Sequence, residues 1–175
     1  SNEKVAEKGH KTEEAINTID EKLTRYLITL SSEALSQKES EVLTNILDSS
    51  RDLERIGDHA EALININDYL QRKNVQFSNS ALEELEDIYR QTSEFVKDAL
   101  ESVENNDLEM AESLIERHEA INKMERVLRK THIKRLNNGE CSTQAGVNFI
   151  DIISHYTRVS DHAMNLAEKV LAEQI

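Results

Sequence analysis

Glu54 and Asp58 are the side chains best placed to do chemistry, because they stand four residues apart in a stretch with helical hydrophobic spacing. Leu53, Ile56 and Ala60 mark the core side of that helix. At about 100° per residue, the two acids lie about 150° away from the core side and should face solvent or a partner surface. Two carboxylates at this spacing suit a hard or borderline metal cation, which takes several oxygen ligands.

The segment that carries this acidic pair occurs twice in the chain. Residues 52–60 read Asp-Leu-Glu-Arg-Ile-Gly-Asp-His-Ala, and residues 155–163, 103 positions later, read His-Tyr-Thr-Arg-Val-Ser-Asp-His-Ala. Asp58 therefore corresponds to Asp161. A repeat at a fixed offset indicates one structural unit used twice. Because the repeated residues are mostly polar, a packing requirement alone does not account for them, which favours a binding role.

A second pair of matching segments supports the duplication. Glu-Ala-Ile-Asn stands at residues 14–17 and again at residues 119–122, an offset of 105 residues. This offset exceeds the 103 of the first pair of segments by two residues, which a difference in loop length can account for. Each unit is predicted to contain a first helix with this motif and a second helix with Asp-His-Ala. His59 and His162 of the second helices could supply nitrogen ligands or orient the acids.

Two further histidines, His118 and His132, fall on the apolar stripe of a predicted helix. The residue that matches His118 in the first unit is Glu13, which also lies on its stripe. A polar group at an inward position must be paired or bound, because burying it alone costs a few kcal/mol. A neighbouring carboxylate is the expected partner of each histidine, and a bound ion is the alternative.

An acidic pair one helical turn apart is also common on solvated helix faces. Arg51 and Arg55 stand close enough to Glu54 and Asp58 to neutralise them. Both interpretations of the pair, cation binding and a salt-bridged surface, therefore stay open at this point.

The composition favours an all-α protein, since its 175 residues include no Pro and only four Gly, and 38% are apolar. The formal net charge of −13 argues against binding nucleic acid and against docking directly on anionic lipid. Cys141 is the single cysteine, which excludes a disulfide framework. No apolar run approaches the roughly 20 residues of a membrane span.

Five long helices are predicted from the hydrophobic spacing and the capping residues. Their expected positions are about 4–35, about 38–72, a third that starts near Ser80, a fourth that opens at Asn106, and a fifth from near Thr143 to the end. The connections are short, so successive helices are expected to pack antiparallel.

The two units are unequal, with two helices in residues 3–75 and three helices in residues 76–175. An apolar groove is therefore expected around Leu23, Leu27, Val42 and Ile46, where a third helix would cover the first two. The chain begins Ser-Asn, which looks like the scar of a cleaved tag and suggests a fragment. Sharing the groove with a second copy would give a homodimer.

Residues 53–60 closely resemble the Leu-Glu-Arg-Ile-Gly-Asp signature of the PhoU family, regulators of phosphate uptake, and the likeness extends over nearly the whole chain. The resemblance implies tandem three-helix bundles related by a pseudo-twofold axis. Free-standing members have six helices, so it also implies that the first helix is missing here. The family's Glu/Asp-x-x-x-Asp motifs bind clusters of iron or zinc.

Carried onto this sequence, the resemblance assigns the first motif to Glu54 and Asp58. The second motif keeps Asp161 but has Thr157 where an acid is expected. The remaining positions that the resemblance implies as metal ligands are Glu13, Asp20, His118 and Glu125. Full occupancy of the second site is not expected, because Thr157 lacks a carboxylate.

PhoU-like domains also form the cytoplasmic C-terminus of bacterial sodium/phosphate cotransporters. The resemblance favours this context, a cytoplasmic domain tethered to the inner membrane through a transmembrane region missing from this chain. A free-standing cytoplasmic regulator is the alternative. Its expected partner is a membrane phosphate transporter, in the same chain or a separate one.

The leading hypothesis from the sequence is a non-enzymatic regulatory domain in phosphate uptake that presents an acidic, metal-binding face. One alternative is a metal-dependent enzyme on a helical bundle, which would require Glu54, Asp58 and a group such as Glu13 or His118 to meet in a closed pocket. The other is a metal-free helical adaptor, in which Glu54 and Asp58 pair with basic residues.

Overall fold

The computed structural model describes residues 2–172, which form five helices and confirm the all-α prediction. The helices are α1 (Asn2–Ser31), α2 (Gln37–Arg72), α3 (Asn79–Asn105), α4 (Leu108–Asn137) and α5 (Thr143–Leu171). For α2 to α5, a capping side chain accepts a hydrogen bond from a backbone amide of the first turn. Ser36 and Glu39 form the expected reciprocal capping box before α2.

Several predicted helix ends were wrong by a few residues. The first helix ends at Ser31, before the predicted residue 35. Asn106 does not open α4 but ends α3 in a left-handed conformation, with φ of 49°, which asparagine tolerates better than most residues. Asp107 caps α4 instead by accepting a hydrogen bond from the Met110 amide at 3.0 Å.

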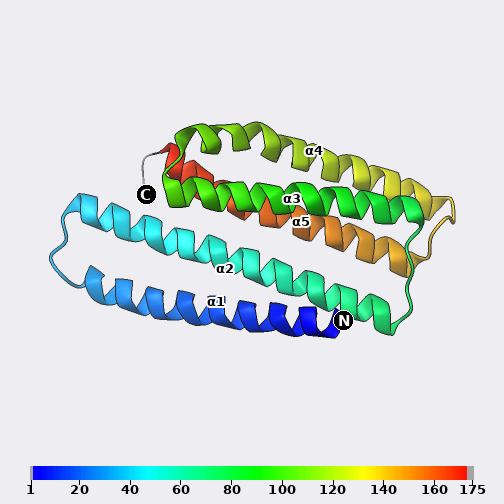
Figure 1. The fold of residues 1–175 in the computed structure, drawn as a ribbon, viewed down its shortest axis with the longest axis horizontal. Coiled ribbons are helices and arrows are strands. Elements are labelled where there is room, and N and C mark those ends of the chain that lie inside the picture. The colour runs from blue at the N-terminus through cyan, green and yellow to red at the C-terminus, as the bar shows by residue number, and fades with distance from the viewer. Residues whose placement is uncertain (1, 173–175) are drawn as a thin grey trace.

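The helices group into a two-helix half and a three-helix half (Figure 1). Helices α1 and α2 form an antiparallel hairpin, whereas α3, α4 and α5 all contact one another. Among the described residues, the helix contact between the halves is that of α2 with α5. The prediction that successive helices all pack together was therefore wrong for α2 and α3, because α2 packs its free side against α5, its equivalent in the repeat.

The three-helix half contains the main hydrophobic core. α3 lays Phe95 and Ile88, both fully buried, onto the apolar sides of α4 and α5. The core also includes Ala99, Ala111, Leu114, Ile121, Leu128, Phe149, Ile153, Ala163, Ala167 and Val170. By area, burying a large apolar side chain contributes roughly 1.5–3 kcal/mol.

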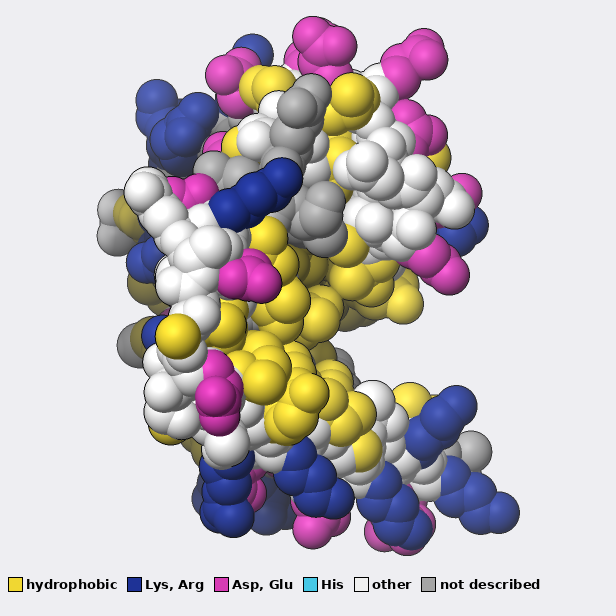
Figure 2. All heavy atoms as spheres, turned by 90° about the vertical axis from the view of Figure 1, so that its left-hand side faces the viewer, with side chains coloured by type: hydrophobic (Ala, Val, Ile, Leu, Met, Phe, Trp, Pro, Cys, Tyr) yellow, Lys and Arg dark blue, Asp and Glu magenta, His cyan; other side chains and the backbone are white. Residues whose placement is uncertain are grey.

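The matching positions of the two-helix half are less well covered. Ile46 is 41% exposed, whereas Phe149, its equivalent in the repeat, is 0% exposed. Val42 is likewise exposed and its equivalent Ala145 is buried. Seen from the end that carries the α1–α2 turn, hydrophobic side chains line a hollow between the halves (Figure 2). The two halves of the duplication therefore differ because α3 covers only one of them.

An apolar cavity of about 370 Å³ lies at the predicted groove, lined by Leu27, Leu30, Leu35, Val42, Leu43 and Ile46 with Lys38 and Glu39 at its edge. We predict that the protein self-associates through this surface, because a soluble monomer gains by burying contiguous apolar area. Light scattering of wild type should show a dimer at high concentration, and Val42→Lys with Ile46→Lys should give a monomer.

The matched control is Ile115→Lys, which changes an exposed isoleucine on α4, away from the groove. This variant should dimerise as wild type does. A monomeric wild type at high concentration would contradict the prediction.

Candidate functional site

The acidic pair of α2 lies on a half-buried surface beside α1. The Arg55 guanidinium contacts both acids, with 3.1 Å from Nη1 to Asp58 Oδ2 and 3.6 Å from Nε to Glu54 Oε2. Burial raises the pKa of Glu54, and the neighbouring carboxylates of Asp58 and Asp20 raise it further, against the opposing effect of Arg55. One arginine thus leaves the negative charge on this surface only partly compensated.

The two predicted ligands on α1 are held by hydrogen bonds of their own. Asp20 Oδ1 accepts a hydrogen bond at 2.6 Å from the hydroxyl of Ser50, a buried residue of α2. Glu13 accepts a hydrogen bond from the side-chain amide of Asn17, one turn further along α1. Asp20 is therefore fixed across the α1–α2 contact, close enough to influence Glu54.

In the second repeat, the predicted ligands are already paired with basic groups. His118 Nε2 donates to Asp161 Oδ1 at 2.9 Å, and Arg158 lies 3.8 Å from the other carboxylate oxygen. The carboxylate partner expected for His118 is therefore confirmed. Thr157, which stands where an acid was expected, turns its hydroxyl to the carbonyl of Ile153 at 3.0 Å.

Glu125 is compensated in the same way by a neighbour on α4. It accepts a 2.7 Å hydrogen bond from Arg129 Nε, and Arg129 also reaches the Ser154 hydroxyl on α5 at 2.8 Å. The second repeat thus uses its acids to hold α4 against α5, which leaves it a poor fit for a metal ion.

The seven predicted ligands do not converge on one point. In the part of the chain that the structure describes, no three His, Cys, Asp or Glu side chains are placed to hold a metal ion together. The acids of the first repeat are the ones that lack full compensation, so they fit a cation better than those of the second repeat. Such an ion would take the rest of its ligands from water or from a partner.

His132 does not have the carboxylate partner that was expected of it. Its ring stacks on Phe149 with centroids 4.0 Å apart, and its Nε2 lies 3.8 Å from Cys141 Sγ. Burial lowers the pKa of His132, and Arg135 lowers it further. The nearby Glu84 carboxylate instead accepts two hydrogen bonds from the Arg135 guanidinium, at 2.6 and 2.7 Å. His132 is therefore a neutral core side chain.

Asp52 was missed by the sequence reasoning and has the densest set of polar contacts between the halves. Its Oδ1 accepts hydrogen bonds from His162 Nδ1 and Asn165 Nδ2, both at 2.9 Å, and its Oδ2 lies 3.2 Å from Lys169 Nζ. All three partners are on α5, so Asp52 ties α2 to the other repeat. Asp52 lies about 70° from the centre of the predicted stripe of Leu53, Ile56 and Ala60, so the sequence carried only a weak signal for it.

Two more histidines meet at the same interface. His59 Nδ1 of α2 lies 3.0 Å from His155 Nδ1 of α5, and the ring of His59 stacks on that of His162 with centroids 5.8 Å apart. Burial is the largest cause that lowers the pKa of both His59 and His155, so both rings are neutral at pH 7.

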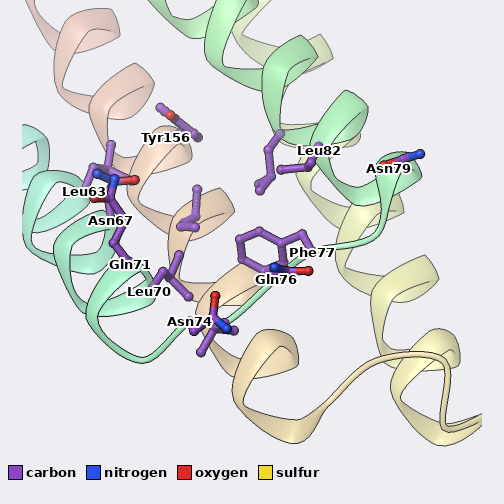
Figure 3. A pocket seen from close by; sticks show the side chains of 13 residues that line it. Leu63, Asn67, Leu70, Gln71, Asn74, Gln76, Phe77, Asn79, Leu82 and Tyr156 are labelled. Carbon is purple, nitrogen blue, oxygen red and sulfur yellow. The ribbon is translucent and has the colours of Figure 1, made fainter. Parts of the chain in front are cut away.

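A cavity of about 740 Å³ opens where the α2–α3 connection crosses α5 (Figure 3). Side-chain amides such as Asn67, Gln71 and Asn74 surround an apolar floor that includes Phe77. Burial, and then Tyr89, raises the pKa of Tyr156 in this cavity to about 12, so its phenol stays protonated. No Lys, Arg or His is among the described residues that line it, so the cavity suits an uncharged group rather than a phosphate.

Within residues 2–172, none of the helices combines the length and apolar composition needed to cross a bilayer.

Comparison with known proteins gives a consistent family match. The family described as "PhoU domain" matches residues 1–66 and 85–170. The curated "Phosphate-specific transport system accessory protein PhoU homolog 1" of Thermotoga maritima is 31% identical over 134 residues, which cover 77% of this chain and 57% of the relative. The chain thus spans little more than half the length of that relative.

Two crystal structures have a similar fold. That of PhoU from Pseudomonas aeruginosa matches with a TM-score of 0.84 and 21% identity, over 97% of this chain and 82% of that one. That of the phosphate transport system regulatory protein PhoU from Streptococcus pneumoniae gives 0.74 and 22%, over 97% and 77%. At these identities the likeness establishes the fold alone.

Proposed function

Because this chain belongs to the PhoU domain family, we propose that it is a regulatory domain acting in phosphate uptake, without an enzymatic step of its own. The observation that carries the proposal is the family match over most of the chain. The curated relative, named an accessory protein of a phosphate-specific transport system, supports it. The partner is then a membrane phosphate transporter, and the location is the cytoplasmic side of the membrane.

The proposed working surface is the acidic face of the first repeat, which we define as Glu54, Asp58 and Asp20. A cation there, iron or zinc as the family resemblance implies, would neutralise carboxylates that repel one another. Glu54 and Asp58 would hold it from one helical turn, and Asp20 would add negative charge from α1. Burial, and then the Asp58 carboxylate, raises the pKa of Glu54. This supports the assignment, because a bound cation would stabilise the ionised carboxylate.

A tethered context is the finer part of the proposal. We propose that the domain serves a sodium/phosphate cotransporter-related protein, in which the transport step takes place in membrane helices outside this chain. The acidic face would then mediate contact with a basic surface of the transporter, directly or through the bound cation.

The enzyme alternative is less well supported by the contacts of the described residues. It requires a third group beside Glu54 and Asp58, but Glu13 is bonded to Asn17 and His118 to Asp161. The metal-free adaptor remains the competing proposal, favoured by the contacts of Arg55 with both acids.

Metal analysis of purified protein after incubation with ferrous or zinc ions tests the proposed face. We expect Glu54→Ala with Asp58→Ala to lower the bound metal clearly below that of wild type, while circular dichroism shows that the helices remain. Asp161→Ala is the matched control, since Asp161 is the equivalent acid but is paired with His118. Equal metal content in the double variant and wild type would exclude this face, and a wild type without metal would favour the adaptor.

A further inference from the structure

The pseudo-twofold relation between the repeats pairs up four polar residues at the α2–α5 contact. With the offset of 103 residues, Asp52 corresponds to His155 and His59 corresponds to His162. The structure joins Asp52 to His162 and, at the related position, His155 to His59. One position therefore holds a carboxylate–histidine pair, and the other holds two histidines.

The two positions differ in the groups that they bring together. At the first, the Asp52 carboxylate is surrounded by three donors from α5. At the second, two like nitrogen atoms, Nδ1 of His59 and Nδ1 of His155, face each other at 3.0 Å. Neutral imidazole carries its single proton on either nitrogen. In the absence of an ion, one ring donates its Nδ1 proton to the other. An ion can take the place of that proton when both rings carry their proton on Nε2, because both Nδ1 lone pairs are then available to it.

The separation of these atoms suits a transition-metal ion. Two nitrogen ligands that lie about 2.1 Å from an ion and about 90° apart are about 3.0 Å from each other. That arrangement is the one of neighbouring ligands in octahedral or square-planar coordination, which Ni²⁺ and Cu²⁺ adopt. Imidazole is a ligand type that suits these ions.

The surroundings of the pair are compatible with a cation. The negative charge of Asp58 lies near His59, and that of Asp151 lies near His155. Near His59, Asp58 opposes the positive charge of Arg158. His162 stacks on His59 while its own Nδ1 is held by Asp52, which fixes one side of the His59 ring. Both rings of the pair are only half-buried, so water can reach a bound ion.

We propose that His59 and His155 bind a borderline transition-metal ion of the Ni²⁺ or Cu²⁺ class between the two repeats. The site uses ring nitrogens and adjoins the acidic face at Asp58, and it does not depend on the proposed role in phosphate uptake. Since the described residues offer no third protein ligand in place, water completes the coordination. The ion would link α2 of one repeat to α5 of the other and so fix the relative orientation of the two halves.

Titration calorimetry with NiCl₂, on protein freed of any affinity tag, tests the site directly. We expect one Ni²⁺ per chain in wild type, with no binding of MgCl₂, because Mg²⁺ prefers oxygen ligands. Bound Ni²⁺ should raise the thermal midpoint of unfolding. His59→Gln and His155→Gln should each weaken Ni²⁺ binding by more than the roughly 10-fold to 100-fold that loss of a second-shell partner costs.

Two controls separate this site from other sources of binding. His10→Gln removes a histidine of the α1–α2 hairpin that pairs with Glu61, and it should bind Ni²⁺ as wild type does. Glu54→Ala, which changes the acidic face but keeps Asp58, should also keep the Ni²⁺ site. A wild type that binds no Ni²⁺, or equal affinity in His59→Gln, His155→Gln and wild type, would overturn the proposal.

Discussion

Replacing Asp52 with alanine is expected to lower the free energy of unfolding by about 3–5 kcal/mol, the cost of removing one partner of a buried ion pair. Asp52 is 9% exposed, and its loss would leave Lys169 and His162 in the α2–α5 contact without their acceptor. Removing a negative charge from a chain of net charge −13 would by itself reduce repulsion, so the expected loss comes from the broken contacts.

Urea unfolding followed by circular dichroism would measure this change. Asp48→Ala is the matched control, since Asp48 is an exposed aspartate one turn earlier on α2. Its effect should stay within about 0.5 kcal/mol, as for most surface substitutions. A loss below about 1 kcal/mol in Asp52→Ala would mean that the carboxylate does not hold the two halves together.

The same substitution at two equivalent positions is expected to have very different effects. Ile121→Ala should destabilise the protein by about 2–5 kcal/mol, because Ile121 is 2% exposed and α3 closes the core around it. Ile16→Ala, at the equivalent position of the first repeat, should cost clearly less, because Ile16 is only half-buried beside Gly57. The larger cost reflects the cavity left in a close-packed core.

Denaturant unfolding of the two variants measures the difference, and the pair serves as its own control, since residue type and motif are identical. Equal losses would mean that the first repeat is as well covered as the second. One cause of equal losses is self-association through the apolar groove, and light scattering on the same samples would reveal it.

Much of the fold could be predicted because its determinants are local or periodic. The capping box of Ser36 and Glu39 and the turn at Gly139, with φ of 71°, are set by neighbours in the sequence. The repeat offset indicated which helices are equivalent. The contact of α2 with α5 could not be predicted from local patterns, because it depends on which apolar helix faces stay uncovered after the helices within each unit have packed together.

The candidate site was harder to predict, because a carboxylate's role depends on neighbours from other helices. The sequence placed Glu54 and Asp58 together but could not show that His118 of α4 pairs with Asp161 of α5. Asp52 and His155 were not singled out, although the offset makes them equivalent. Their significance arises only when α2 and α5 are laid side by side.

The single helix-to-helix contact between the halves restricts how the molecule can deform. Within residues 2–172 the hairpin of α1 and α2 meets the other half through α2 and α5, so a rotation of the hairpin about α5 would disrupt that contact and leave the contacts of α3 with α4 and α5 in place. Asp52, with its hydrogen bonds to α5, and Ile56, which packs against the core, are among the contacts that such a rotation would break.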